Sequence, residues 1–336
     1  MTTREHVAVV GAGAWGTALA KVLGDKGFPV RLHSRSAELA KAMADDGQNF
    51  RYLPGFPLPK TVEPTASLAH ALEGSTLVVL VVPSHAFRET LVSARSLLPA
   101  EATLVSATKG IENDTLMLMT DVARDVLGPA TDDRLTILSG PSFAKEVAGG
   151  VPTNAVVASS NEALSQRVQH AFATERLRVY SSDDPIGVEV GGALKNVIAI
   201  AAGACDGLGF GHNTRAALIT RGLAEIARIA LAKGGNVLSI AGLAGMGDLV
   251  LTCTGELSRN RTVGFEMGRG KKLPEVLAKL GHVAEGVRTA KSAHDLAKQL
   301  DVELPICNEV YNVLYEGKPP LRAVEDVLRR PLKKEW

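Results

Sequence analysis

A lysine and an asparagine, Lys195 and Asn196, interrupt an almost wholly apolar stretch of this 336-residue sequence. Because the neighbouring residues offer little polar surface, we expect the lysine to be buried. Burial removes the water that stabilises an ammonium ion, and it lowers the pKa of a lysine toward neutrality. A lysine of this kind suits a general base that works near pH 7. For the asparagine two interpretations stay open, a ligand contact and a hydrogen-bonded core amide.

A glycine motif, GAGAWG at residues 11–16, follows the apolar run Val7–Val10 and precedes a helical segment. In this GxGxxG spacing Gly11 permits a tight turn and Gly13 lets the backbone approach a pyrophosphate. Gly16 lets the helix lie close to the strand. The helix N-terminus then offers free N–H groups to phosphates. The motif predicts dinucleotide binding, and a tight turn without a ligand is the alternative.

The residues after the next apolar run bear on the choice of cofactor. Proteins that bind NAD often place an acid about 20 residues beyond the glycines, where it holds the ribose 2′-hydroxyl. The segment RLHSR at residues 31–35 has no acid, and Arg35 suits a 2′-phosphate instead. An arginine exposed to solvent is the alternative interpretation. The sequence therefore predicts that NADPH is used at least as well as NADH.

Two further positions follow expected strand ends, where open α/β sheets bind ligands. Lys109 follows the apolar run Thr103–Val105, and Gly140 and Ser142 follow Leu135–Leu138. We expect these residues near both cofactor and substrate, with a surface lysine as the alternative for Lys109.

A polar cluster lies between residues 242 and 261. Three glycines precede Asp248, and Ser258, Arg259 and Asn260 follow in a row. A hydroxyl, a guanidinium and an amide together suit a phosphate, since charge-assisted hydrogen bonds contribute roughly 1.5–3 kcal/mol each. The alternative is an ordinary basic helix start. Glu285 adds an acid in a turn beside a glycine.

The elements that must position these residues divide the chain in two. A length of 336 residues exceeds what one core usually supports, so we expect domains at 1–187 and 188–336. Alternating apolar strands and helices predict a parallel, doubly wound α/β sheet in the first. No convincing strand follows Val179–Tyr180, so the second is expected to be all-helical. The expected strands of the first domain are Val7–Val10, Val30–Leu32, Leu77–Val82, Thr103–Val105 and Leu135–Leu138. Its expected helices are Thr17–Leu23, a helix from Ser36 to Ala44, Phe87–Leu98 and Asp114–Leu127. In the second domain the expected helical stretches are Val188–Ala204, Thr214–Ala232, Pro274–Leu280, Val287–Leu300 and Ile306–Tyr315.

Composition excludes several classes of protein. A net charge of +1 and 4% aromatic residues argue against a nucleic-acid binder. No apolar run approaches the roughly 20 residues of a membrane span. Three scattered cysteines and unpaired histidines argue against disulfides and metal sites, and favour a cytoplasmic protein. Residues 4–20 partly mimic a signal peptide, but their three glycines and weakly charged start fit a strand and turn better.

Six segments together resemble the bacterial NAD(P)-dependent glycerol-3-phosphate dehydrogenases, in the same order over about residues 7–290. The resemblance implies reversible reduction of dihydroxyacetone phosphate to sn-glycerol 3-phosphate, which supplies glycerophospholipid synthesis. It implies a Rossmann domain, a helical domain like the C-terminal domain of 6-phosphogluconate dehydrogenase, NADP(H) or NAD(H) without a metal, and a possible homodimer. The segments are GAGAWGTALA, SATKGIE, LSGPSFAKEVA, VEVGGALKNVIAIAAG, GLAGMGDLVLTCTGELSRNRTVG and AEGVRTA.

The resemblance also implies roles for single residues. Lys195 is similar to the family's proton acceptor. Ala14 stands where the family often has serine, and His33 where an aromatic side chain is common. The implied substrate contacts are Lys109, Gly140, Ser142, Lys195, Asp248, Ser258, Arg259 and Asn260. The implied cofactor contacts are Gly11, Gly13, Ala14, Trp15, Gly16, His33, Arg35, Lys109, Ala144, Arg259, Val283 and Glu285.

Two alternatives stay open. A 3-hydroxyacid dehydrogenase on a similar plan also uses a lysine and an asparagine, although the Ser-Arg-Asn cluster favours a phosphate over a carboxylate. A dinucleotide-sensing protein without turnover is the other, and Lys195 in an apolar helix argues against it.

Overall fold

The computed structural model describes residues 5–281, 284–332 and 334–335. The chain forms two compact units. The first comprises Met1–Lys109 and Met117–Glu189, and the second comprises Gly110–Leu116 and Val190–Trp336. The division after residue 187 stays a prediction, and each unit is described by itself.

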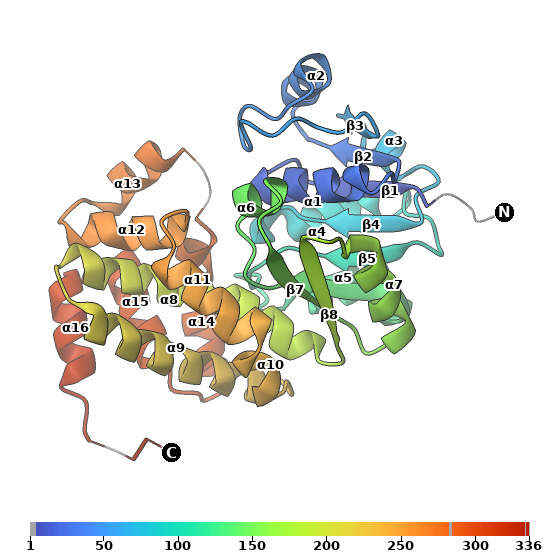
Figure 1. Cartoon of the computed structure of the whole chain (residues 1–336). Coiled ribbons are helices and arrows are strands. Elements are labelled where there is room, and N and C mark those ends of the chain that lie inside the picture. The colour runs from blue at the N-terminus through green and yellow to red at the C-terminus, as the bar shows by residue number, and fades with distance from the viewer. Residues whose placement is uncertain (1–4, 282–283, 333, 336) are drawn as a thin grey trace. The chain divides into compact units, whose positions relative to one another are not determined.

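The first unit is built on an eight-stranded sheet with the order β3-β2-β1-β4-β5-β6-β7-β8 (Figure 1). All neighbouring strands are parallel except β6 and β7, which are antiparallel. The connection from β6 to β7 carries only the five-residue helix α6, so the chain does not return to the opposite end of the sheet. The strands are β1 Val7–Val10, β2 Val30–His33, β3 Val62–Thr65, β4 Leu77–Leu80, β5 Thr103–Ser106, β6 Leu135–Ser139, β7 Thr153–Ala158 and β8 Leu177–Ser182.

Helices cover both faces of this sheet, which is the doubly wound arrangement that the alternation predicts. Val7 and Val9 of β1 face one buried cluster with α1, α2 and α7, while Ala8 and Val10 face another with α3, α4 and α5. The helices are α1 Ala14–Asp25, α2 Ala37–Asp46, α3 Leu68–Leu72, α4 Ser84–Ala94, α5 Met119–Leu127, α6 Ala144–Ala148 and α7 Glu162–Phe172, with a 3₁₀ turn η1 at Pro129–Arg134.

Several elements differ from the sequence prediction, among them the unpredicted helices α3, α6, α7 and α16 (Pro320–Leu328), the strands β3 and β7, and the start of α5. β3 contains Pro64, which lacks an N–H donor and is tolerated because β3 is an edge strand. β7 is also unpredicted. Helix α5 begins at Met119 rather than Asp114, because Leu116 has a φ of 59° and residues 110–116 belong to the second unit.

The second unit is helical, and its described residues contain no strand. By length and composition α8 could cross a membrane, but 89% of its most apolar window is buried, as in a core helix. The elements are α8 Pro185–Gly207, which begins in the first unit, α9 His212–Ala232, α10 Val237–Ala241, the π-helical turn η2 Leu243–Gly247, α11 Asp248–Thr254, α12 Arg259–Gly268, α13 Leu273–Leu280, α14 Glu285–Gln299, α15 Pro305–Tyr315 and α16 Pro320–Leu328.

A buried glutamate, Glu189, closes the N-terminus of α5. Its carboxylate accepts hydrogen bonds from the backbone N–H and the hydroxyl of Thr120, at 3.0 and 2.7 Å. Burial raises the pKa of Glu189 to about 7, and the charge of Asp121 acts in the same direction, while the Thr120 bonds oppose it.

This pKa makes stability depend on pH. The folded chain binds the Glu189 proton more tightly than the unfolded chain does, so its contribution is fully present below about pH 4.5 and lost as pH rises through about 7. The loss amounts to roughly 3 kcal/mol. Urea unfolding from pH 4.5 to 8 should therefore show a shallower decline for Glu189→Gln than for the parent chain. The exposed control Glu175→Gln should keep the parent's decline, and identical curves for all three would contradict the assignment.

Candidate active site

The glycine loop between β1 and α1 requires glycine at two positions. Gly11 has a φ of +123°, and a Cβ there would lie 2.7 Å from the carbonyl oxygen of Val81. A Cβ on Gly16 would lie 1.8 Å from the carbonyl oxygen of Gly11. At Gly13 a Cβ would meet nothing within 4 Å, so this backbone faces open space. The helix begins at Ala14 without a side-chain cap, which leaves its first N–H groups for an anion.

Two observations fit a dinucleotide at this loop. The indole N–H of Trp15 is buried and has no hydrogen-bond partner in the protein, so it is available to an acceptor on a bound molecule. Ala144 and Trp15 pack against the same small apolar cluster, which places the start of α6 beside the loop.

Asn49 holds this loop from behind, and sequence reasoning missed it. Its amide donates to the carbonyl of Ala12 at 3.0 Å and to the hydroxyl of Thr17 at 2.8 Å. Its oxygen accepts from the backbone N–H of Tyr52. A single asparagine in a loop rich in proline and glycine gives no signal in the sequence.

The end of β2 carries His33 and Arg35. His33 is 7% exposed, and burial lowers its pKa, with a smaller contribution from the charge of Arg35. Arg35 is exposed just beyond the strand. Because Arg35 is exposed, its guanidinium is accessible to an anion.

Three residues predicted to bind substrate come together at the ends of β5 and β6. Lys109 donates its ammonium hydrogen to the carbonyl oxygen of Gly140 at 3.2 Å, and the hydroxyl of Ser142 donates to the same oxygen at 2.9 Å. Gly140 has a φ of +128°, and a Cβ there would lie 3.0 Å from Cα of Ala155. The loop conformation therefore depends on glycine at this position.

In the second unit Lys195 is buried, at 6% exposure, and so are its partners. Its Nζ lies 2.5 Å from Oδ1 of Asp248 and donates to the hydroxyl oxygen of Thr252 at 2.9 Å. Burial disfavours the ammonium, while the carboxylate of Asp248 favours it. The lowered pKa of Lys195 stays a prediction. Thr252 was missed, although it follows Asp248 by four residues and so shares its helix face.

Close backbone packing brings Asp248 to Lys195. A Cβ on Gly191 of α8 would lie 2.7 Å from the carbonyl oxygen of Ala244 in η2. A Cβ on Gly245 would lie 1.9 Å from the carbonyl oxygen of Ile240. Helix α11 begins at Asp248, directly after this turn.

The Ser-Arg-Asn cluster forms the start of α12. Ser258 caps the helix by accepting a hydrogen bond from the N–H of Arg261 at 3.2 Å, so its own hydroxyl hydrogen can serve a ligand. Arg259 is exposed at this helix start; partial loss of solvation lowers its pKa, and the charge of Glu285 on α14 opposes that shift. The structure therefore brings together Arg259 and Glu285, both predicted to contact the cofactor.

A chain of amides links three helices of this unit. The N–H of Gly286 donates to Oδ1 of Asn260 at 2.9 Å, and Nδ2 of Asn260 donates to Oδ1 of Asn196 at 2.9 Å. Asn196 in turn donates to the carbonyl of Gly192 at 3.4 Å. Asn196 is thus a hydrogen-bonded core amide, one of the two interpretations the sequence left open. One Nδ2 hydrogen of Asn260 is not used by these contacts and can reach a ligand.

Neither a metal site nor a reactive cysteine is found among the described residues. No group of three or more histidine, cysteine, aspartate or glutamate residues is placed to hold a metal in the part of the chain that the structure describes. The three cysteines are buried thiols, and burial raises the pKa of Cys205 to about 11 and of Cys253 to about 12.

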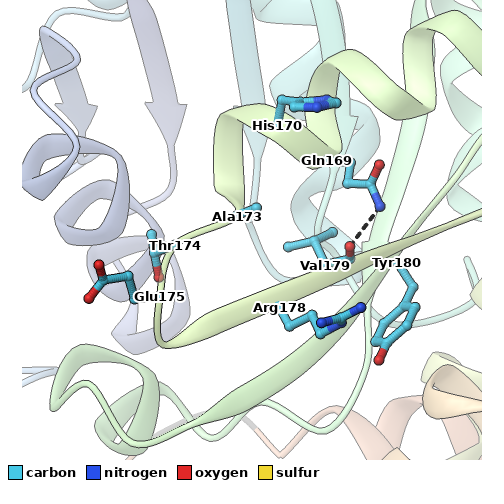
Figure 2. Close-up of a pocket in the computed structure, with 8 residues that line it drawn as sticks. All are labelled: Gln169, His170, Ala173, Thr174, Glu175, Arg178, Val179 and Tyr180. Atoms are coloured by element: carbon cyan, nitrogen blue, oxygen red, sulfur yellow. Dashed lines mark hydrogen bonds between the residues drawn. The ribbon is translucent and has the colours of Figure 1, made fainter.

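A hollow of about 470 Å³ lies between α7 and the edge strand β8, and none of its lining residues is a predicted site residue (Figure 2). Gln169 donates to the carbonyl of Val179 at 2.7 Å, and Thr174 bonds both backbone groups of Leu177. These contacts occupy part of the open edge of β8, which discourages pairing with another chain.

The sequence and the fold agree with known proteins. Residues 6–165 match the family model of the NAD-dependent glycerol-3-phosphate dehydrogenase N-terminus, and residues 184–325 match that of the C-terminus. The chain belongs to the NAD-dependent glycerol-3-phosphate dehydrogenase family.

Relatives of this family match almost the whole chain. A glycerol-3-phosphate dehydrogenase (NAD(P)+) of Myxococcus xanthus is 53% identical over 327 residues, which are 97% of this chain and 98% of the relative. The crystal structure of the glycerol-3-phosphate dehydrogenase of Coxiella burnetii has a TM-score of 0.93 and 41% identity, covering 97% of this chain and 99% of that one. The yeast enzyme gives 0.82 at 26% identity, covering 98% and 100%.

The family recognised from the motifs is therefore confirmed, and so is the fold class, with the antiparallel pair β6–β7 as the one departure from an all-parallel sheet. The chain is an NAD(P)-dependent oxidoreductase of the glycerol-3-phosphate dehydrogenase family. The roles of single residues stay predictions. Val283, one of the predicted cofactor contacts, lies outside the described residues.

Proposed function

We propose that this chain catalyses the reversible reduction of dihydroxyacetone phosphate to sn-glycerol 3-phosphate. The observation that carries the proposal is the buried ammonium of Lys195, held by Asp248 and Thr252 in the same unit as the Ser258–Asn260 cluster. A positive group that can exchange a proton and a set of donors for a phosphate are what this reaction requires. Membership of the family supports the same substrate.

Proton transfer falls to Lys195 in this mechanism. In reduction its ammonium donates a proton to the oxygen on C2 and stabilises the negative charge that develops there. In oxidation the neutral amine accepts the proton of the C2 hydroxyl. Asp248 and Thr252 fix the direction of Nζ, so little reorganisation is needed at the moment of transfer. The nicotinamide, when bound, supplies or accepts the hydride.

Phosphate binding orients the reacting carbon. Arg259 provides a planar, charged donor, and Ser258 and Asn260 each retain a hydrogen for a ligand. Binding energy at the phosphate then holds C2 in place for chemistry at Lys195. The proposed substrate residues are Lys109, Gly140, Ser142, Lys195, Asp248, Ser258, Arg259 and Asn260. The proposed cofactor residues are Gly11, Gly13, Ala14, Trp15, Gly16, His33, Arg35, Lys109, Ala144, Arg259, Val283 and Glu285.

A substrate panel tests this proposal. NADPH oxidation should be measured with dihydroxyacetone phosphate and with several ketoacids that carry a carboxylate instead of a phosphate. We expect turnover with dihydroxyacetone phosphate alone. Turnover with a ketoacid would favour the hydroxyacid dehydrogenase, and tight NADPH binding without any turnover would favour a sensing protein.

Arg35 yields a prediction about cofactor choice. Its exposed guanidinium beyond β2 suits the 2′-phosphate of NADPH, and no acid stands at residues 31–35 to hold a 2′-hydroxyl. The parent chain should have a kcat/KM for NADPH at least equal to that for NADH. Arg35→Gln should lower the value for NADPH by about tenfold or more, the worth of one charged hydrogen bond. The value for NADH serves as the control and should stay unchanged, whereas a strong NADH preference in the parent would contradict the role of Arg35.

We also propose a cytoplasmic location, a homodimer, and no part in nucleic-acid binding. Small-molecule chemistry with NAD(P) supports the cytoplasmic location. The net charge of only +1 supports the absence of nucleic-acid binding. The dimer rests on family resemblance, and light scattering on a sizing column measures it directly.

A further inference from the structure

Asp206 is not among the predicted site residues. Its side chain connects three helices of the second unit through hydrogen bonds. It lies in the last turn of α8, and its side chain is 5% exposed. Its Oδ1 accepts hydrogen bonds from Nε and Nη2 of Arg215 on α9, at 2.9 and 2.5 Å. Its Oδ2 accepts from Nε and Nη2 of Arg261 on α12, at 3.0 and 2.7 Å. One carboxylate thus receives two guanidinium groups, each through two donors.

Helices α8 and α12 pack closely, and this packing brings Asp206 to Arg261. A Cβ on Gly203 would lie 1.9 Å from the carbonyl oxygen of Arg261, and a Cβ on Gly264 would lie 1.9 Å from that of Ile200. The two helices therefore meet backbone to backbone through glycine. The hydrogen bonds from Arg261 to Asp206 and from Asn260 to Asn196 add polar contacts to this packing.

The polar contacts lie in the first turn of α12, beside the proposed phosphate residues. Arg261 is held by Asp206, and Asn260 is held by Asn196 of the same helix α8. Arg259 precedes both by one or two positions, so a rotation of α12 that moves Arg261 also moves Arg259.

We propose that Asp206 is a positioning residue for this reaction: by holding Arg261 it fixes the first turn of α12 and so directs Arg259 and Asn260 at the substrate phosphate. The proposal rests on the proposed function, since it takes these two residues as phosphate contacts. Without the carboxylate, two guanidinium groups whose side chains are 23% and 20% exposed would face each other and repel. Arg261 would then leave its place, and the side chains of the first turn of α12 would shift with it.

The test compares a phosphorylated with an unphosphorylated substrate. Asp206→Asn keeps the size of the side chain and removes its charge. The kcat/KM for dihydroxyacetone phosphate, divided by that for dihydroxyacetone, should fall by about tenfold, because only the first substrate uses the phosphate residues. Loss of folded protein lowers both values equally and leaves the ratio unchanged. Asp206→Glu, which keeps the charge, should recover part of the ratio.

Two further variants complete the test. Glu225→Gln removes another buried carboxylate of this unit, one that binds the first N–H groups of α15, and should keep the parent ratio. Arg261→Lys keeps the charge but loses the paired contact to Asp206. If Asp206→Asn does not fold, the same ratio of kcat/KM values is measured for Arg261→Lys and should fall. If Arg259→Ala lowers the ratio while Asp206→Asn and Arg261→Lys leave it at the parent value, the positioning role is overturned and the function stands. If Arg259→Ala also leaves it unchanged, the phosphate assignment itself fails.

Discussion

Replacing Lys195 with methionine is expected to lower kcat by about 10³-fold, within the range that general acid–base catalysis contributes. The KM for dihydroxyacetone phosphate should change by less than about threefold, because Lys195 acts mainly on charge that develops in the transition state. Steady-state kinetics at saturating NADPH measure both values. Methionine matches the length and apolar stem of lysine, so the packing of α8 is preserved.

This variant also loses stability, and the two effects must be separated. Asp248 has a side chain that is 2% exposed, and the substitution removes its ammonium partner. Removing one member of a buried ion pair costs about 3–5 kcal/mol. The double variant Lys195→Met with Asp248→Asn removes both charges and should recover much of that stability in urea unfolding. It should remain as inactive as the single variant. Recovery of kcat in the double variant, or a normal kcat in the single one, would refute proton transfer by Lys195.

Lys195 could be found in the sequence because its neighbours are so apolar that a lysine among them is conspicuous. Its partners could not be found in that way. Asp248 and Thr252 lie 53 and 57 residues further along the chain, and only the close packing of α8 against η2 brings them to Nζ. The sequence therefore singled out both Lys195 and Asp248, but the contact between them appears only in the fold.

The strands show the same division between local and tertiary signals. Continuous apolar runs such as Val7–Val10 and Leu77–Leu80 are buried on both faces, and this pattern is visible in the sequence. Strand β3 could not be predicted from the sequence, because Pro64 argues against a strand unless the strand is known to lie at the sheet edge. Asn49 and Asp206 are likewise ordinary polar residues in the sequence. Their structural roles become apparent only from their contacts, which Asn49 makes to the backbone of a distant loop and Asp206 to distant arginines.

Replacing Arg259 with alanine is expected to lower the kcat/KM for dihydroxyacetone phosphate by about 10²-fold. A charged hydrogen bond contributes roughly 1.5–3 kcal/mol, and each 1.4 kcal/mol corresponds to a factor of ten. Arg259 is exposed at the start of α12, so its donors are open to a phosphate from solution. The loss should appear mainly as a higher KM, since the phosphate contacts lie away from the reacting carbon.

Three comparisons make this prediction specific to the phosphate. The kcat/KM for dihydroxyacetone should stay within about threefold of the parent value, because that substrate offers the guanidinium no anion. Arg259→Lys should give an intermediate loss, since lysine restores the charge without the planar pair of donors. Arg269→Ala changes an exposed arginine at the other end of α12, and it should leave both substrates unaffected. Equal losses for both substrates in Arg259→Ala would mean that Arg259 supports the fold or the cofactor rather than the phosphate.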